Sequence, residues 1–148
     1  MSYRLAKQRD TQAVEDAFVA LALASPAYGY SKQPSWRKGM ALFKRMLEQG
    51  GAYIVNEAYL LLVSEGVAWH SYDTCLEEVL VLKLYEGGSI TSVADALEHI
   101  ARVRGITTIL ASDSSINFRM GAVYQRAGFK PITHTYYKEL SWDNGSQS

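Results

Sequence analysis

Cysteine is almost absent from this sequence, because Cys75 is the only one in 148 residues. A single cysteine excludes an internal disulfide and a cysteine-rich zinc site. The three histidines are far apart and form no HxH or HxxxH spacing, so no metal site is predicted. No run approaches the roughly 18 apolar residues that span a bilayer, and the first residues lack the basic and apolar regions of a secretory signal. We therefore expect a cytoplasmic protein that is not bound to a membrane.

Acidic residues are also absent from Ala17 to Leu47, where five lysines and arginines occur. From Glu57 to Glu98 the bias reverses, since eight acidic residues accompany a single base, Lys83. This asymmetry predicts either a site for an anionic partner beside an acidic face, or two charged surfaces that are simply solvated.

The overall composition is that of a folded globular domain rather than a disordered chain. Hydrophobic residues make up 48% of the sequence and charged residues 20%. A chain of this length buries about two-thirds of its unfolded surface on folding, so one domain is stable without outside help. We expect that domain to cover residues 1–142 and the polar stretch 143–148 to be a disordered tail.

Hydrophobic periodicity predicts helices after Asp10, after Ser35, around Val93–Ala101 and over Asn117–Ala127. Short apolar runs predict strands. These are Tyr3–Ala6, Ala52–Val55, Tyr59–Val63, Leu76–Leu84, Ile106–Ala111 and Pro131–Leu140, and Val67–Tyr72 is either a further strand or the end of the one before it. The unbroken apolar centre of Leu76–Leu84 indicates a strand that is buried on both faces. We therefore expect a single α/β domain with a mixed central sheet of about six to seven strands, flanked by about four helices.

The stretch Asn117–Phe129 carries a specific pattern: an asparagine, a small residue, a tyrosine and a terminal Gly-Phe. Gly128 suits the left-handed position that ends a helix, and Phe129 can fold back onto the last turn. This stretch resembles the late helix of the GNAT acetyltransferase superfamily, and the order of elements is similar to that family over most of the chain. The resemblance implies a GNAT-like fold and transfer of an acyl group from acetyl-CoA or another acyl-CoA.

The resemblance also implies which residues would hold the cofactor. In the family, the backbone of the fourth strand pairs with the pantetheine arm, and the loop after that strand holds the pyrophosphate. An asparagine of the late helix bonds the arm. The matching residues here are Leu80, Val81, Leu82, Gly87, Gly88, Ser89 and Asn117.

The loop Tyr85–Ser92 departs from the family's pattern, because the basic first residue is missing and Glu86 would repel a phosphate. Its two glycines and the helix N-terminus that follows could still present N–H groups to an anion. Alternatively, Ser92 with Asp95 forms a simple helix cap. Both interpretations remain open at this stage.

Acylation of an amine needs a base for the acceptor's proton and an acid for the departing thiolate. The resemblance assigns the acid to Tyr124, which is protonated at neutral pH because the ordinary pKa of tyrosine is near 10. Alternatively, Tyr124 is a core aromatic. The base candidates are Glu77 and Glu78, which point to opposite faces of a strand, and His70. Partial burial of a glutamate raises its pKa toward neutrality.

The early helical region forms the acceptor side in the family. Here it interleaves aromatic and basic residues, a pattern that predicts either binding to a nucleic-acid base and phosphate or core aromatics with cations that reach solvent. These substrate-binding candidates are Tyr28, Tyr30, Lys32, Trp36 and Arg37. The segments Trp69–Tyr72 and Leu76–Leu82 are also similar to small GNAT-like proteins encoded by bacteriophages, some relatives of which modify DNA bases.

Three functions follow from these patterns. The first is an acyl-CoA-dependent N-acyltransferase that transfers an acetyl group directly to an amine in a ternary complex. The second is a Mom-like enzyme that modifies a DNA base, in the host cytoplasm if a bacteriophage encodes it. The third is a non-catalytic GNAT-like binding or structural protein with a degraded CoA site. We expect a small-molecule or macromolecular amine as acceptor, and a monomer or homodimer.

Overall fold

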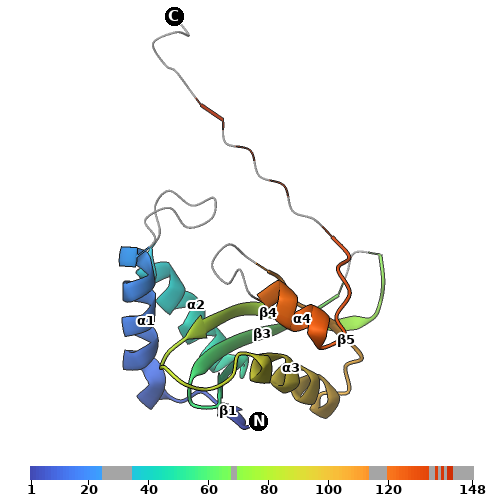
Figure 1. Cartoon of the computed structure of the whole chain (residues 1–148), viewed down its shortest axis with the longest axis horizontal. Helices are drawn as coiled ribbons and strands as arrows, with labels where there is room; N and C mark the ends of the chain where they lie inside the picture. The colour runs from blue at the N-terminus through green and yellow to red at the C-terminus, as the bar shows by residue number, and fades with distance from the viewer. Residues whose placement is uncertain are drawn as a thin grey trace, which may run out of the picture.

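Helices cover both faces of a sheet in this protein (Figure 1). The structure is a computed structural model. It describes residues 1–24, 35–67, 70–113, 120–133, 136, 138, 140 and 141. The predicted tail at 143–148 lies outside the described residues, as do the site candidates Tyr28, Tyr30, Lys32 and Asn117.

Five strands form one sheet in the described part of the chain, in the order β1-β2-β3-β4-β5. The strands are β1 (Tyr3–Leu5), β2 (Ala52–Val55), β3 (Tyr59–Val67), β4 (Thr74–Lys83) and β5 (Thr108–Leu110). The pairs from β1 to β4 are antiparallel, whereas β5 is parallel to β4. The predicted mixed α/β sheet is therefore confirmed, with fewer strands than the predicted six to seven.

The predicted last strand, Pro131–Leu140, accounts for part of this difference. Its first three residues are not in a strand, and positions 134, 135, 137 and 139 lie outside the described residues. A proline has no N–H to donate to a neighbouring strand, so Pro131 adds nothing to the pairing of this segment. The prediction is wrong for residues 131–133.

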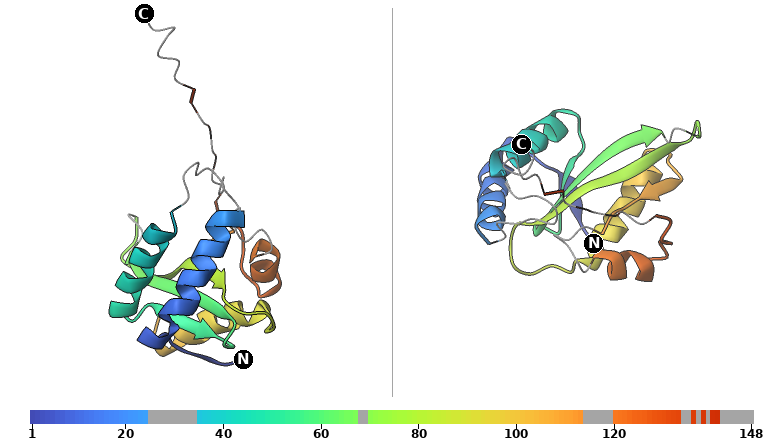
Figure 2. Two further views of the ribbon diagram at one scale, coloured as in Figure 1. Left: turned by 90° about the vertical axis from the view of Figure 1, so that its left-hand side faces the viewer. Right: turned by 90° about the horizontal axis from the view of Figure 1, so that it is seen from above.

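Four α-helices occur in the described residues, in agreement with the predicted number. They are α1 (Thr11–Ala24), α2 (Trp36–Glu48), α3 (Thr91–Val103) and α4 (Met120–Arg126), and a 3-10 turn (Gln8–Asp10) precedes α1. Figure 1 and Figure 2 show α1 and α2 on one side of the sheet and α3 and α4 on the other. We call these sides the α1/α2 face and the α3/α4 face.

The end of α4 has the predicted geometry. Gly128 has a φ of 93°, in the left-handed region. The amide of Phe129 donates to the carbonyl of Tyr124 at 2.9 Å. The two rings lie 5.1 Å apart between centroids. A helix that ends at glycine and folds an aromatic back over its last turn therefore holds Tyr124 from both the backbone and the side chain.

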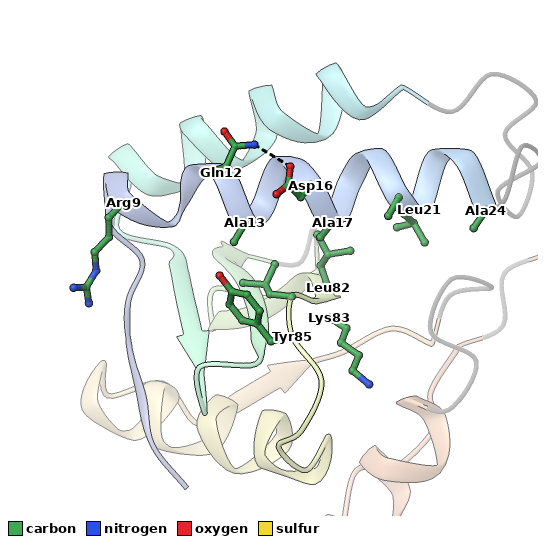
Figure 3. A pocket seen from close by; sticks show the side chains of 12 residues that line it. Arg9, Gln12, Ala13, Asp16, Ala17, Leu21, Ala24, Leu82, Lys83 and Tyr85 are labelled. Carbon is green, nitrogen blue, oxygen red and sulfur yellow. Dashed lines mark hydrogen bonds between the residues drawn. The ribbon is translucent and has the colours of Figure 1, made fainter.

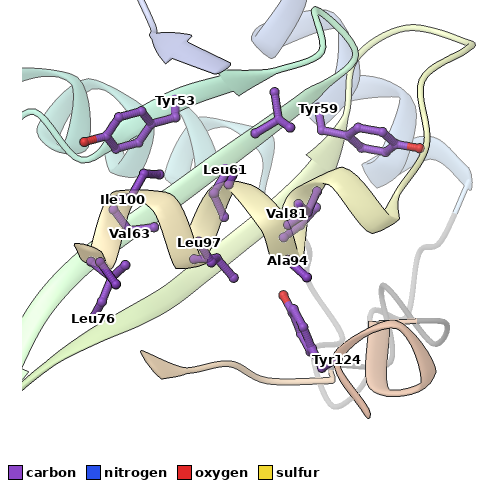
Figure 4. Close-up of a cluster of buried hydrophobic side chains, with 14 of the residues drawn as sticks. Tyr53, Tyr59, Leu61, Val63, Leu76, Val81, Ala94, Leu97, Ile100 and Tyr124 are labelled. Carbon is purple, nitrogen blue, oxygen red and sulfur yellow. The ribbon is translucent and has the colours of Figure 1, made fainter. Parts of the chain in front are cut away.

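A separate apolar core lies on each face of the sheet. On the α3/α4 face, Leu61 and Val63 of β3 pack in one buried cluster, drawn in Figure 4. On the α1/α2 face, Leu60 and Leu62 pack with Phe43 of α2 in a second cluster. Consecutive side chains of a strand alternate between faces, so β3 supplies both cores in turn.

Strand β4 contains one more residue than the stretch of β3 it pairs with. Leu62 lies opposite Leu80, but Val63 lies opposite Glu78, so Val79 has no counterpart in β3. An inserted residue of this kind is a β-bulge, and it changes which residues point to which face.

β5 pairs with only part of one edge of β4, over Cys75–Glu77. The described residues contain no further strand beside that edge. β4 is thus held between two cores, with β3 along one edge and β5 along part of the other.

Gly51, between α2 and β2, packs against the backbone of β3. Its carbonyl accepts a hydrogen bond from the Val63 amide at 2.8 Å. A Cβ at Gly51 would overlap the Val63 carbonyl oxygen. Gly51→Ala should therefore lower the free energy of unfolding by about 2–4 kcal/mol in a denaturant titration, because backbone must move.

The matched control for this prediction is Gly105→Ala. Gly105 has a φ of +70° with open space around its Cα. The cost there is conformational strain alone, about 1 kcal/mol. An equal loss of stability in the two variants would contradict the close approach at Gly51.

Candidate active site

A glutamate and a tyrosine meet where α4 packs against the bulged strand. The Tyr124 hydroxyl donates a hydrogen bond to Oε1 of Glu78 at 2.7 Å. Tyr124 is buried in the core of the α3/α4 face, and Figure 4 shows its hydroxyl directed toward Ala94 of α3. Glu78 is half-buried. The pair therefore combines a proton donor and a proton acceptor in a site largely shielded from water.

Burial shapes the proton affinity of both groups. It raises the pKa of the Glu78 carboxyl, the hydrogen bond from Tyr124 partly opposes this, and the negative charge of Asp113 adds to it. Burial also raises the pKa of the Tyr124 phenol well above its ordinary value, with the charge of Glu78 as the next cause. Tyr124 therefore keeps its proton at neutral pH, and Glu78 accepts a proton more readily than a solvated carboxylate does.

The other two base candidates lie elsewhere. Glu77 is paired with Ser64 of β3 and its carboxylate lies beside Gly66, on the α1/α2 face. The prediction that Glu77 and Glu78 point to opposite faces is thus confirmed. His70 is exposed in the connection between β3 and β4. Of these three candidates, Glu78 is the one that the fold brings to Tyr124.

The strand candidates Leu80, Val81 and Leu82 follow the bulge. Val81 belongs to the core of the α3/α4 face, whereas Leu80 and Leu82 pack on the α1/α2 face. The predicted burial of this strand on both faces is confirmed. Because the side chains fill the cores, a ligand along this part of β4 would contact the main chain of these residues.

The loop after β4 turns at two glycines with left-handed backbone, Gly87 at a φ of 90° and Gly88 at 70°. A Cβ at Gly88 would lie 2.9 Å from the Cβ of Ala58, so the loop packs closely on the turn between β2 and β3. Within the described chain, the amides of Gly87, Gly88 and Ser89 donate to no backbone carbonyl. These N–H groups are therefore available to water or to an anion.

Two features of this loop differ from the sequence-based expectations. Glu86 bonds Lys83 Nζ at 3.0 Å, so the charge that would repel a phosphate has a neutralising partner. The Ser92 hydroxyl accepts a hydrogen bond from Asn56 Nδ2 at 2.7 Å. The residue that precedes α3 is Ile90, which makes no side-chain cap. The capping interpretation of Ser92 with Asp95 is therefore wrong.

A pocket of about 700 Å³ lies between α1 and the end of β4 (Figure 3). Alanines of α1 form one wall, and Leu82, Leu84 and Tyr85 form the opposite one. Its polar groups include Lys83 and Asp16. The pocket opens on the α1/α2 face, whereas the Glu78–Tyr124 pair lies on the α3/α4 face. The two features share β4 but are not one site.

Two substrate-binding candidates, Trp36 and Arg37, lie at the start of α2. Trp36 is partly buried against the core of the α1/α2 face. The exposed Arg37 places its guanidinium 5.1 Å from the centroid of the Trp36 ring. This matches the predicted alternative of a core aromatic with a cation that reaches solvent. A nucleic-acid partner stays a prediction.

Three further observations concern metals, membranes and the thiol. Among the described residues, no group of three or more His, Cys, Asp and Glu side chains could hold a metal ion. No helix in that part of the chain combines the length and the apolar character needed to cross a membrane. Cys75 is buried near the start of β4, where it packs as a small apolar residue.

Solved acetyltransferases share this fold. A probable acetyltransferase matches with a TM-score of 0.63 and 16% identity, covering 97% of this chain and 100% of that one. A predicted acetyltransferase with acetyl-CoA from Clostridium acetobutylicum matches with a TM-score of 0.63 and 16% identity, covering 95% of each chain. An aminoglycoside 6′-N-acetyltransferase from Acinetobacter haemolyticus matches with a TM-score of 0.64 and 12% identity, covering 97% of this chain and 100% of that one. The fold is GNAT-like.

At these identities the similarity is one of fold, and the sequence matches no protein-family model and no curated protein. The predicted GNAT-like fold is confirmed. Two residues beside the site were not predicted from the sequence, Asp113 and the Gly121 on which it packs. The one hint in the sequence is the place of Asp113, an acidic residue between the strand at Thr108–Leu110 and the late helix.

The raised pKa of Glu78 predicts a pH-dependent cost to stability. The folded state binds a proton at Glu78 more tightly than the unfolded state does, so this residue makes the fold less stable as pH rises above the unfolded pKa. Glu78→Gln keeps an acceptor for Tyr124 without the charge. The variant should melt about 1–4 °C higher than the wild type at pH 8 and at nearly the same temperature at pH 4. A melting difference that does not change between these pH values would contradict the burial of an ionisable Glu78.

Proposed function

We propose that this protein is an acyl-CoA-dependent N-acyltransferase that transfers an acetyl group directly to an amine in a ternary complex. The Glu78–Tyr124 pair carries the proposal, because it holds a carboxylate oxygen and a phenol oxygen 2.7 Å apart beside the bulge of β4. The GNAT-like fold supports it, since solved proteins with that fold include acetyltransferases, one of them with acetyl-CoA.

Acetyl-CoA would supply the acyl group as an activated thioester. The main chain of residues 80–82, which follow the bulge, would hold its pantetheine arm. The amides of Gly87, Gly88 and Ser89 would hold the pyrophosphate near the positive end of α3. Asn117, outside the described residues, is the further candidate for the arm.

The pair can move a proton without leaving a charged tyrosine behind. Glu78 takes the proton that the attacking amine loses. Tyr124 gives its own proton to the departing thiolate and receives one from Glu78, so both residues end as they began. Because the pKa of Tyr124 is strongly raised, a free tyrosinate is unfavourable, and gain and loss of the proton at this hydroxyl must coincide.

The amine of the acceptor would have to reach Glu78 on the α3/α4 face, where the Glu78–Tyr124 pair lies. The pocket beside α1 and the predicted acceptor residues Trp36 and Arg37 lie on the α1/α2 face, so they would contact only parts of an acceptor that are remote from the amine. The acceptor is either a small amine or an amine on a macromolecule.

A buried carboxylate favours the enzyme over a non-catalytic protein with the same fold. Removing Glu78 from water costs free energy that a purely structural residue at this position would not. Ionisable groups with such perturbed pKa values cluster at functional sites. DNA-base modification stays a prediction that rests on the basic early helices.

The proposal predicts a separation between cofactor binding and turnover. Tyr124→Phe should lower kcat about ten- to a thousandfold while leaving the calorimetric affinity for acetyl-CoA unchanged, because the phenol acts on the leaving group. Turnover is measured as thiol release from acetyl-CoA with a panel of primary amines, including spermidine and a lysine peptide.

Tyr72→Phe is the matched control, since Tyr72 is fully exposed in the connection between β3 and β4. It should leave both affinity and turnover unchanged. Absence of heat from millimolar acetyl-CoA would remove the acetyltransferase proposal, and an unchanged kcat in Tyr124→Phe would remove the tyrosine from the mechanism.

A further inference from the structure

Asp113 lies in the connection between β5 and α4, with its carboxylate against the backbone of Gly121. A Cβ at Gly121 would lie 2.5 Å from Asp113 Oδ2 and 3.1 Å from its Cγ. Any larger residue at position 121 would therefore displace the carboxylate. Gly121 lies three residues before Tyr124, on the same side of the helix. The negative charge of Asp113 thus lies against α4, the helix that carries the candidate acid Tyr124.

Asp113 acts on both members of the pair through its charge. It raises the pKa of Glu78 and contributes to the raised pKa of Tyr124. No lysine or arginine of the described chain forms an ion pair with Asp113 or Glu78. The uncompensated charge of Asp113 is therefore felt by the pair rather than by a nearby cation.

Among the described residues, the other elements packed around the pair add no further charge to it. α3 supplies apolar side chains to this core, among them Ala94 and Leu97. The neighbouring carboxylate of β4, Glu77, points to the opposite face. Within that part of the chain, the titratable groups that act on Glu78 are thus Tyr124 from α4 and Asp113 from the connection before α4.

We propose that Asp113 is a positioning residue for the Glu78–Tyr124 pair: its carboxylate packs on Gly121, one helical turn before Tyr124, and so places a negative charge beside the pair. Its role in turnover rests on the proposed acyltransferase function. The electrostatic coupling between Asp113 and Glu78 does not, and it can be measured in the protein without substrate.

A ¹³C NMR titration of the Glu78 carboxyl carbon, in the full chain, measures this coupling directly. Asp113→Asn should lower the pKa of Glu78 by about 0.3 to 1 unit at low salt, because one nearby negative charge is removed. Added salt should shrink the difference between the two proteins, since Asp113 is exposed and its field is screened. Asp95→Asn removes an exposed carboxylate from α3 and is the matched control, expected to leave the titration of Glu78 unchanged.

Gly121→Ala tests whether the contact with Gly121 holds the Asp113 carboxylate in place. The added methyl group displaces the carboxylate but keeps its charge, so the pKa of Glu78 should fall by part of the change seen in Asp113→Asn. Alanine is a better helix former than glycine, so α4 itself is not weakened. The double variant should titrate like Asp113→Asn alone. Fully additive shifts would show that Gly121 acts by another route and would overturn the seating of Asp113.

Kinetics separate this role from simple structural support. Turnover needs ionised Glu78, so kcat/KM rises with pH through its pKa. Asp113→Asn should move this rise in kcat/KM to lower pH, by the same amount as the NMR titration gives for the pKa of Glu78. Loss of structural support alone would instead lower kcat at every pH and leave the pH of the rise unchanged.

Failure of this proposal differs from failure of the proposed function. An identical pKa of Glu78 in wild type and Asp113→Asn would overturn the role of Asp113, whatever the activity. A lowered pKa in a protein that acylates no amine would uphold the coupling and count against the acyltransferase.

Discussion

The bulge at Val79 is the feature on which the candidate site depends. If the pairing of Leu62 with Leu80 continued without an inserted residue, Glu78 would lie opposite Ser64 and point to the α1/α2 face. The extra residue sets Glu78 opposite Val63 instead, on the α3/α4 face, where Tyr124 lies. One inserted residue thus brings the carboxylate to the phenol while Leu80, Val81 and Leu82 still fill their cores. Bulges next to active sites commonly redirect a side chain in this way.

The rest of the structure stabilises a pair that is itself costly to bury. Tyr124 is fixed by the end of α4, where Gly128 turns the chain and Phe129 packs on its ring. The two apolar cores hold β4 from both faces and so fix the backbone that carries Glu78. The free energy lost at one carboxylate is offset by a large apolar interior. Stability is commonly reduced in this manner where a site needs a reactive group.

Local sequence patterns predicted much of the fold, because a helix, a buried strand or a helix end is specified by only a few neighbouring residues. The helical spacing of Val93, Leu97 and Ile100 and the apolar run of β4 were enough for α3 and the central strand. The end of α4 at Gly128 and Phe129 was likewise predictable, because the left-handed backbone that ends a helix favours glycine. By contrast, the residues after Pro131 suggested a strand, but residues 131–133 are not in one. Strand pairing depends on a neighbouring strand, and the pattern of a single segment does not reveal that neighbour.

The site could be predicted only in part. Tyr124 and Glu78 were both candidates, but their hydrogen bond depends on a bulge that leaves no mark in the sequence of β4. The choice of Glu78 over Glu77 is a matter of register, which is set by β3 and not by the two glutamates themselves. Asp113 was missed because its contact with Gly121 is a tertiary contact that no local pattern in the sequence reveals.

A crystal structure of the full chain with acetyl-CoA tests directly whether the Glu78–Tyr124 pair is the acyl-transfer centre. We expect the pantetheine arm along the main chain of residues 80–82 and the thioester sulfur within about 3.5 Å of the Tyr124 hydroxyl oxygen. Acetyl-CoA bound with its thioester away from this pair, for example in the pocket beside α1, would contradict it.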